Sequence, residues 1–212
     1  MAFPLPAHVS RACAAVVALI SVAALVLQYG LVLEATRVAP GPWLGTVRFF
    51  SYFTILSNLG VAWVTANAAW GRSGTWTRPR WRGLVGLCIG VTGLVYVTVL
   101  QGLWQPQGWQ WWADISLHYA SPVLYLAWWL LGTSHGQLGM RDLLAWLWFP
   151  LVYLGWVLLR GAWVAEYPYP FLDLTAHRAM DVARNCVLVT LAFVLVGAVL
   201  LGLDRILPGG RR

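Results

Sequence analysis

Six long apolar stretches, separated by short connectors, account for most of the chain. They cover about 11–33, 47–70, 83–104, 111–133, 142–162 and 182–203. A membrane-spanning helix needs about 20 mostly apolar residues, and each stretch is long enough. The connectors between them carry the glycines and prolines that are typical of turns. The pattern therefore predicts an all-α, polytopic membrane protein, with 1–212 forming a single six-helix transmembrane domain.

The composition supports this class. The chain is 60% hydrophobic and only 10% charged, with a mean hydropathy of +0.69, which is far from the balance of a soluble domain. The net charge of +7 does not predict a nucleic-acid partner, because the basic residues lie between the apolar runs rather than along an exposed face. We expect membrane lipids as the surroundings. The N-terminal run is too long for a signal peptide, so it is predicted to be a retained first span.

The distribution of arginines predicts the orientation. With six spans, both termini share a side with the second and fourth connectors. That side carries nine of the 14 basic residues, and the opposite side carries five that are offset by several acidic residues. Because cytoplasmic loops are enriched in Arg and Lys, we expect a multi-pass protein of the cell (cytoplasmic) membrane with its N- and C-termini inside.

Prolines are expected to disturb two of these spans. Pro122 lies in the fourth stretch and Pro150 in the fifth. Each should kink its helix and free the carbonyl four residues earlier, at His118 and Trp146 respectively.

The second stretch carries polar side chains that would be costly in hydrocarbon without a purpose. Arg48 stands at its start. With about 100° per residue on a helix, Ser51, Thr54, Asn58 and Thr65 fall within an arc of roughly 60°. One face of this span is predicted to be polar.

The fourth stretch has a polar face of its own, because Asp114, His118, Ser121 and Tyr125 share a similar arc. Thr54 and His118 each lie seven residues into spans that start on the same side of the membrane. At about 1.5 Å per residue, both should lie roughly 10 Å below their helix starts. The two side chains are predicted to be level with each other.

This pairing has chemical sense. A hydroxyl becomes an effective nucleophile when a neighbouring base takes its proton, and imidazole is the usual base. Thr54 is therefore the candidate nucleophile and His118 the candidate base. Asp114, one turn earlier, could orient the imidazole or merely cap its helix. The candidates to hydrogen-bond a developing oxyanion are Ser51, Asn58 and Ser121.

Each residue also has a structural interpretation. A threonine in a membrane helix often donates back to the carbonyl four residues earlier, here that of Phe50. A lone buried histidine is often a packing link between helices.

Other side chains are candidates for binding a ligand, a metal or a cofactor. The candidates for binding a substrate head group are Arg48, Arg184 and Tyr125; Arg184 could instead pair with Asp181, three residues away. The three cysteines lack metal-site spacing, and only His118 lies inside a span, whereas a membrane haem needs facing histidines. We expect no metal and no cofactor.

Three short motifs carry a resemblance to a known family: FTILSN at 53–58, LHYASP at 117–122 and YPYPF at 167–171. They resemble segments of the androgen-induced and androgen-dependent integral membrane proteins, over most of the chain from the second span to the sixth. The resemblance implies a bacterial-type intramembrane threonine hydrolase of fatty acid esters of hydroxy fatty acids, with Thr54 as nucleophile and His118 as base. One departure is Ser57, which shifts the match at Asn58 by one position.

Two hypotheses follow. In the first, the protein hydrolyses lipid esters within the membrane, with a lipid ester or fatty acid as ligand. In the second, it is a non-catalytic membrane protein that binds a lipid or small molecule, or a small transporter, whose polar faces line a cavity. The oligomeric state stays open.

Overall fold

The computed structural model describes residues 4–207. Within this range every regular element is helical, so the predicted all-α class is confirmed. The α-helices are α1 (Ala7–Ala35), α2 (Pro42–Phe50), α3 (Phe53–Ala69), α4 (Pro79–Val95), α5 (Trp109–Ile115), α6 (Ser121–Gly132), α7 (Met140–Trp146), α8 (Trp148–Val164) and α9 (Ala179–Ile206). The shorter elements are the 3-10 turns η1 (Thr75–Thr77) and η4 (Pro170–Leu172) and the π turns η2 (Tyr96–Leu100) and η3 (Ser116–Ala120).

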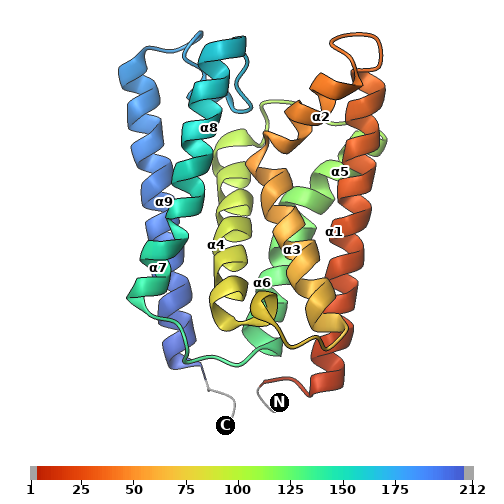
Figure 1. Cartoon of the computed structure of the whole chain (residues 1–212), viewed down its shortest axis with the longest axis vertical. Helices are drawn as coiled ribbons and strands as arrows, with labels where there is room; N and C mark the ends of the chain where they lie inside the picture. The colour runs from red at the N-terminus through yellow and green to blue at the C-terminus, as the bar shows by residue number, and fades with distance from the viewer. Residues whose placement is uncertain (1–3, 208–212) are drawn as a thin grey trace.

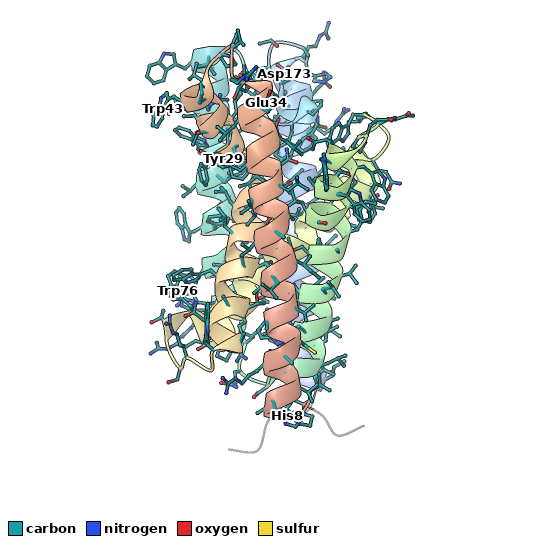
Figure 2. All side chains as sticks on the ribbon, turned by 90° about the vertical axis from the view of Figure 1, so that its right-hand side faces the viewer. His8, Tyr29, Glu34, Trp43, Trp76 and Asp173 are labelled. Carbon is teal, nitrogen blue, oxygen red and sulfur yellow. The ribbon has the colours of Figure 1, made fainter. Side chains whose placement is uncertain are left out.

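The helices form an elongated bundle with α4 near its centre (Figure 1). α4 contacts α3, α6 and α9, while α1 packs along α3 and α6. α1 begins and α9 ends at the same end of the bundle. Glu34, Trp43 and Asp173 lie at the opposite end from His8 and Trp76 (Figure 2).

Several of these helices could span a membrane. Four helical runs within the described residues are long and apolar enough: α1, Pro79–Leu100, Met140–Val164 and α9. The pair α2 and α3 would make a fifth if the two helices together form one broken span. The predicted stretch 111–133 matches the helical run α5–η3–α6. The helical runs thus follow all six apolar stretches of the sequence, and those of sufficient length and hydropathy indicate a membrane protein.

The prediction of one regular helix over 47–70 is wrong. α2 ends at Phe50 and α3 begins at Phe53, with an angle of 74° between them. Ser51 is the C-cap residue of α2, and its hydroxyl donates to the carbonyl of Val47 at 2.7 Å. Ser51 therefore does not share a helix face with Thr54.

The break is stabilised by side chains from far along the sequence. The first backbone N–H groups of a helix have no partner within the helix. The N–H of Phe53 donates to the hydroxyl of Tyr153 on α8 at 3.1 Å, and that hydroxyl donates to the carbonyl of Ser51 at 2.8 Å. The N–H of Thr54 donates to the hydroxyl of Tyr169 at 3.4 Å. Two tyrosine hydroxyls thus cap α3 in place of a local side chain.

The two prolines coincide with helix irregularities. α7 and α8 meet at Leu147, three residues before Pro150. The π turn η3 comes just before Pro122, and in it the N–H of Ser121 bonds five residues back. With this spacing the N–H that Pro122 lacks would face the carbonyl of Leu117, one residue before the carbonyl of His118 that α-helical spacing predicts.

Candidate active site

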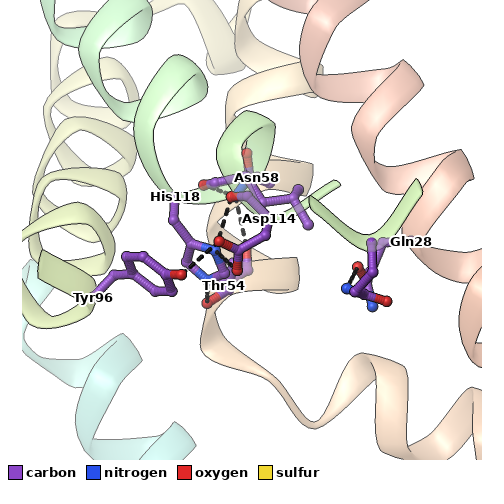
Figure 3. Close-up of polar contacts among 8 residues, drawn as sticks. Gln28, Thr54, Asn58, Tyr96, Asp114 and His118 are labelled. Atoms are coloured by element: carbon purple, nitrogen blue, oxygen red, sulfur yellow. Dashed lines mark hydrogen bonds and ion pairs between the residues drawn. The ribbon is translucent and has the colours of Figure 1, made fainter. Parts of the chain in front are cut away.

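Thr54 and His118 meet inside the bundle. The hydroxyl oxygen Oγ1 of Thr54 lies 3.3 Å from Nε2 of His118, so the prediction that they are level is confirmed (Figure 3). Thr54 is buried in the first turn of α3, and His118 lies in the π turn η3. Their distance is slightly longer than the range of about 2.6–3.2 Å for a nucleophile and its base, as is common before substrate binds. Thr54 cannot bond back to Phe50 in a helix, because Phe50 belongs to α2.

Asp114 lies on the other side of the imidazole. Nδ1 of His118 is 3.1 Å from the backbone carbonyl of Asp114 and 3.2 Å from its carboxylate oxygen Oδ1. The carbonyl accepts the hydrogen bond from the ring, whereas Oδ1 lies close to the ring but makes no hydrogen bond with the described residues. Because Nδ1 faces two acceptor oxygens, it carries the hydrogen, which leaves Nε2 as the acceptor that faces Thr54.

Tyr96, which the sequence analysis did not single out, completes this group. Its hydroxyl donates to Oδ2 of Asp114, and its ring stacks on that of His118 with centroids 3.9 Å apart and an angle of 17°. Tyr96 opens the π turn η2, as His118 lies in the π turn η3. Such turns often occur at functional sites. A tyrosine toward the end of the apolar stretch 83–104 was the only signal in the sequence.

Asn58 positions the site and is not aimed at the nucleophile. Its amide nitrogen donates to the carbonyls of Thr54 at 2.9 Å and Leu117 at 3.1 Å, and both neighbours are acceptors, which fixes the orientation of the amide. The second bond satisfies the carbonyl that lost its partner at Pro122. Asn58 thus links the backbone of Leu117, the residue before His118, to the backbone of Thr54. Both hydrogens of its amide group are used in these two bonds.

The predicted arc of polar residues on the fourth stretch divides at η3. Ser121 faces α1, where its hydroxyl pairs with that of Ser21 at 2.9 Å. Tyr125 is fully buried and donates to the carbonyl of Arg82 at 2.8 Å. A π turn advances each residue by less than 100°, so the residues after it rotate away from the face that Asp114 and His118 share.

The arginines expected to bind a head group have protein partners. Arg48 lies 2.6 Å from Glu166, whose other carboxylate oxygen is 3.2 Å from Arg160. Arg184 is exposed and 3.7 Å from Asp181, which is the alternative pairing considered for it. Neither Arg48, Arg184 nor Tyr125 lines the cavities described next.

Two cavities meet at Thr54. The polar cavity, of about 430 Å³, lies among α1, α3, η2, α5 and the connector after α8, and its wall includes Asp114, His118 and Tyr96. The apolar cavity, of about 110 Å³, lies among α3, α4, α8 and α9. Both walls include Thr54, Leu100 and Tyr169. The nucleophile candidate therefore stands between a polar and an apolar space.

Tyr169 is a second residue without an assigned role in the sequence analysis, although it lies in the YPYPF motif. Its buried hydroxyl faces both the backbone N–H and the side chain of Thr54. Because the hydroxyl accepts from the N–H, its own hydrogen is shared between the side chain of Thr54 and the hydroxyl of Tyr153, which both lie within hydrogen-bond reach.

The described residues contain no group of three or more His, Cys, Asp or Glu side chains arranged to hold a metal ion. Comparison with family models, with curated proteins and with solved structures finds no match for this chain. The fold and the site thus define a class only: an all-helical protein with apolar helices that could span a membrane and with a buried threonine–histidine–aspartate group.

Proposed function

We propose that this protein is an intramembrane hydrolase of lipid esters, with Thr54 as nucleophile and His118 as general base. One observation carries the proposal: the part-buried contact from Thr54 through His118 to Asp114, with Thr54 in the walls of both cavities. Hydroxyl, imidazole and carboxylate in this order form the arrangement used for acyl transfer on several unrelated folds. Fatty acid esters of hydroxy fatty acids, or similar lipids, are the substrates that the sequence resemblance implies.

The geometry supports two successive transfers. Nε2 of His118 takes the hydroxyl proton of Thr54 while Oγ1 attacks the ester carbonyl carbon. The bond to the alcohol oxygen then breaks, and the alcohol leaves with the proton from His118. Water attacks the resulting acyl-threonine after giving a proton to His118, the fatty acid departs, and the proton returns to Oγ1. The backbone carbonyl of Asp114 holds Nδ1–H throughout, and the carboxylate of Asp114, 3.2 Å from Nδ1 and positioned by Tyr96, stabilises the imidazolium.

Tyr169 is the best-placed donor for the charge that develops on the carbonyl oxygen. Ser51 and Ser121 donate to or pair with groups away from Thr54, and the N–H groups of Asn58 are engaged. The hydroxyl of Tyr169 lies against Thr54, with the side chain of Thr54 and the hydroxyl of Tyr153 as its neighbours, so it can donate beside the nucleophile. A donor placed before the reaction begins stabilises the oxyanion without reorganisation.

The location follows from the same features. We place the protein in the cell membrane with six spans, counting α2 with α3 and α5 with α6 as one span each. Both termini would face the cytoplasm, since arginines are enriched at the end of the bundle where α1 begins and α9 ends. The site then lies in the outer half of the bilayer, and membrane lipids supply the substrate.

The test is ester hydrolysis by the purified full chain in lipid nanodiscs. We expect Thr54→Ala and His118→Ala each to lower turnover at least about 10²-fold, which is the typical contribution of such groups. Thr65→Ala is the matched control: Thr65 is a buried threonine of the same helix whose hydroxyl donates to the carbonyl of Val61 at 2.7 Å. Full turnover in both site variants, with folding intact, rules out the mechanism.

The second candidate function is non-catalytic binding of a lipid or small molecule, or its transport, and the two cavities that share Thr54 in their walls favour it. A fluorophosphonate probe distinguishes the two. Binding without catalysis predicts no covalent label at Thr54, together with a rise in melting temperature when a lipid ester is added. Hydrolysis predicts that the label appears on Thr54 and is absent from Thr54→Ala.

A further inference from the structure

The two cavities differ in what they can bind. The apolar cavity contains few polar groups, and its hydroxyls already have partners. Thr92 donates to the carbonyl of Cys88, Thr190 to that of Cys186, and Tyr153 to that of Ser51. Apart from Thr54 and Tyr169, which also line the polar cavity, a ligand group in this space would find hydrocarbon and only hydroxyls that already have partners. A polar group would lose its hydration there without compensation, so the apolar cavity favours an alkyl chain.

The polar cavity carries a pair of amides apart from the Thr54 group. Gln28 on α1 and Gln110 on α5 both line it and are joined by one hydrogen bond, from Nε2 of Gln110 to Oε1 of Gln28 at 2.8 Å. Gln28 stands across from Thr54 and His118 in Figure 3. Whichever amide donates in this pair, one NH₂ group and one carbonyl oxygen remain for a ligand.

The charges around this cavity decide between ligands. Its wall contains the carboxyl group of Asp114 and no lysine or arginine. A carboxylate held there would have no cation beside it and could not donate to the amide carbonyl. A hydroxyl, in contrast, both donates and accepts, which matches the carbonyl and NH₂ groups that the pair leaves free.

We propose that the apolar cavity holds the acyl chain that is transferred to Thr54, and that the polar cavity holds a neutral, hydroxyl-bearing alcohol part such as glycerol. Gln28 and Gln110 bind a hydroxyl of that alcohol and determine specificity for it. This assignment rests on the proposed hydrolysis. It names monoacylglycerol-type esters as preferred over esters whose alcohol part carries a free carboxylate, and it therefore departs from the fatty acid esters of hydroxy fatty acids that the sequence resemblance implies.

Three decanoate esters test the alcohol side: monodecanoylglycerol, propyl decanoate and the decanoate ester of hydroxypropanoate. They share the acyl chain and differ in the alcohol part. The wild-type protein should prefer the glycerol ester to the propyl ester by about tenfold in kcat/KM, the effect of one neutral hydrogen bond. The hydroxypropanoate ester should be the poorest of the three. Gln28→Leu and Gln110→Leu should bring the ratio of glycerol to propyl ester close to one.

The matched control is Gln107→Leu, because Gln107 is exposed in the loop just before α5. It should keep the wild-type ratio. The proposal is overturned if the hydroxypropanoate ester is the best substrate, or if Gln28→Leu and Gln110→Leu lower kcat/KM for all three esters by the same factor.

The acyl side is tested by narrowing the apolar cavity. Cys186→Phe places a ring at its wall and should shift the preferred acyl chain of the glycerol ester toward shorter lengths. Val187→Phe is the control, since Val187 is 60% exposed on the outside of the same helix. An unchanged chain-length profile in Cys186→Phe refutes the assignment of the acyl chain.

A binding experiment separates failure of the alcohol site from failure of the proposed hydrolysis. If the wild-type protein cleaves none of the esters, monodecanoylglycerol is added to Thr54→Ala and the melting temperature is measured. A rise that Gln28→Leu abolishes and Gln107→Leu keeps supports the alcohol site although the hydrolase is refuted. No rise refutes the site as well.

Discussion

Replacing Asn58 with leucine tests whether this residue fastens the two halves of the site together. Leucine keeps the volume but removes the hydrogen bonds to the carbonyls of Thr54 and Leu117. The carbonyl of Thr54 retains its place in the α3 ladder, whereas that of Leu117 loses its partner because Pro122 has no N–H. A bond between helices in a membrane protein contributes about 1–2 kcal/mol at most. We expect Asn58→Leu to lower the free energy of unfolding by that amount, measured by SDS titration in mixed micelles.

The control for this prediction is Asn67→Leu on the same helix. Asn67 also donates to the carbonyl four residues earlier, at 2.8 Å, but it lies at the surface and reaches no second helix. Asn67→Leu should change stability by less than about 0.5 kcal/mol, as is usual for surface substitutions. If the two variants are equally stable, the bond to Leu117 contributes nothing and Asn58 has no fastening role.

Three other substitutions test separate parts of the structure. Tyr96→Phe keeps the ring on His118 but removes the bond to the carboxylate of Asp114, so kcat for ester hydrolysis should fall about tenfold with KM little changed. Asp204→Asn removes a buried charge that accepts two backbone N–H groups at 2.8 and 2.9 Å, and unfolding in SDS should become easier by about 1–3 kcal/mol. Gly83→Ala places a Cβ 2.5 Å from the buried ring of Trp146 and should cost about 1–3 kcal/mol in the same assay.

Each of these has a matched control. Tyr119→Phe should leave kcat unchanged, and an equal loss of kcat in both tyrosine variants contradicts the role of the carboxylate bond. Asp181→Asn alters a half-exposed carboxylate and should leave stability as it is. Gly86→Ala meets its nearest neighbours at 3.7 Å, which is ordinary contact, so a cost equal to that of Gly83→Ala argues against the steric account.

The pairing of Thr54 with His118 could be predicted because depth in a helix is a simple count of residues. The two counts of seven residues agree although each runs through an irregularity, the break at 51–52 for Thr54 and the π turn at 116–120 for His118. The partners around that pair could not be predicted in this way. Ser51 and Ser121 were assigned to the polar faces by counting through a break at 51–52 and a π turn at 116–120, and each irregularity changes the direction of every later side chain.

Tyr96, Tyr169 and the two glutamines illustrate a second limit. Their side chains matter because helices that are distant in sequence bring them to one space, and no periodicity marks a residue whose partner lies 18 to 115 positions away.

The sequence by itself determined the helical class, the bounds of the apolar runs and the level at which Thr54 meets His118. These follow from hydropathy and helix geometry, which are local properties. The tertiary structure alone decided that α3 begins at Phe53, where two tyrosine hydroxyls cap it. It also decided that Asn58 donates to the carbonyl of Leu117, which Pro122 leaves without a backbone partner. It also decided that Thr54 stands between a polar and an apolar cavity. Those features depend on which groups remain unsatisfied after the helices form, and only the packed bundle supplies their partners.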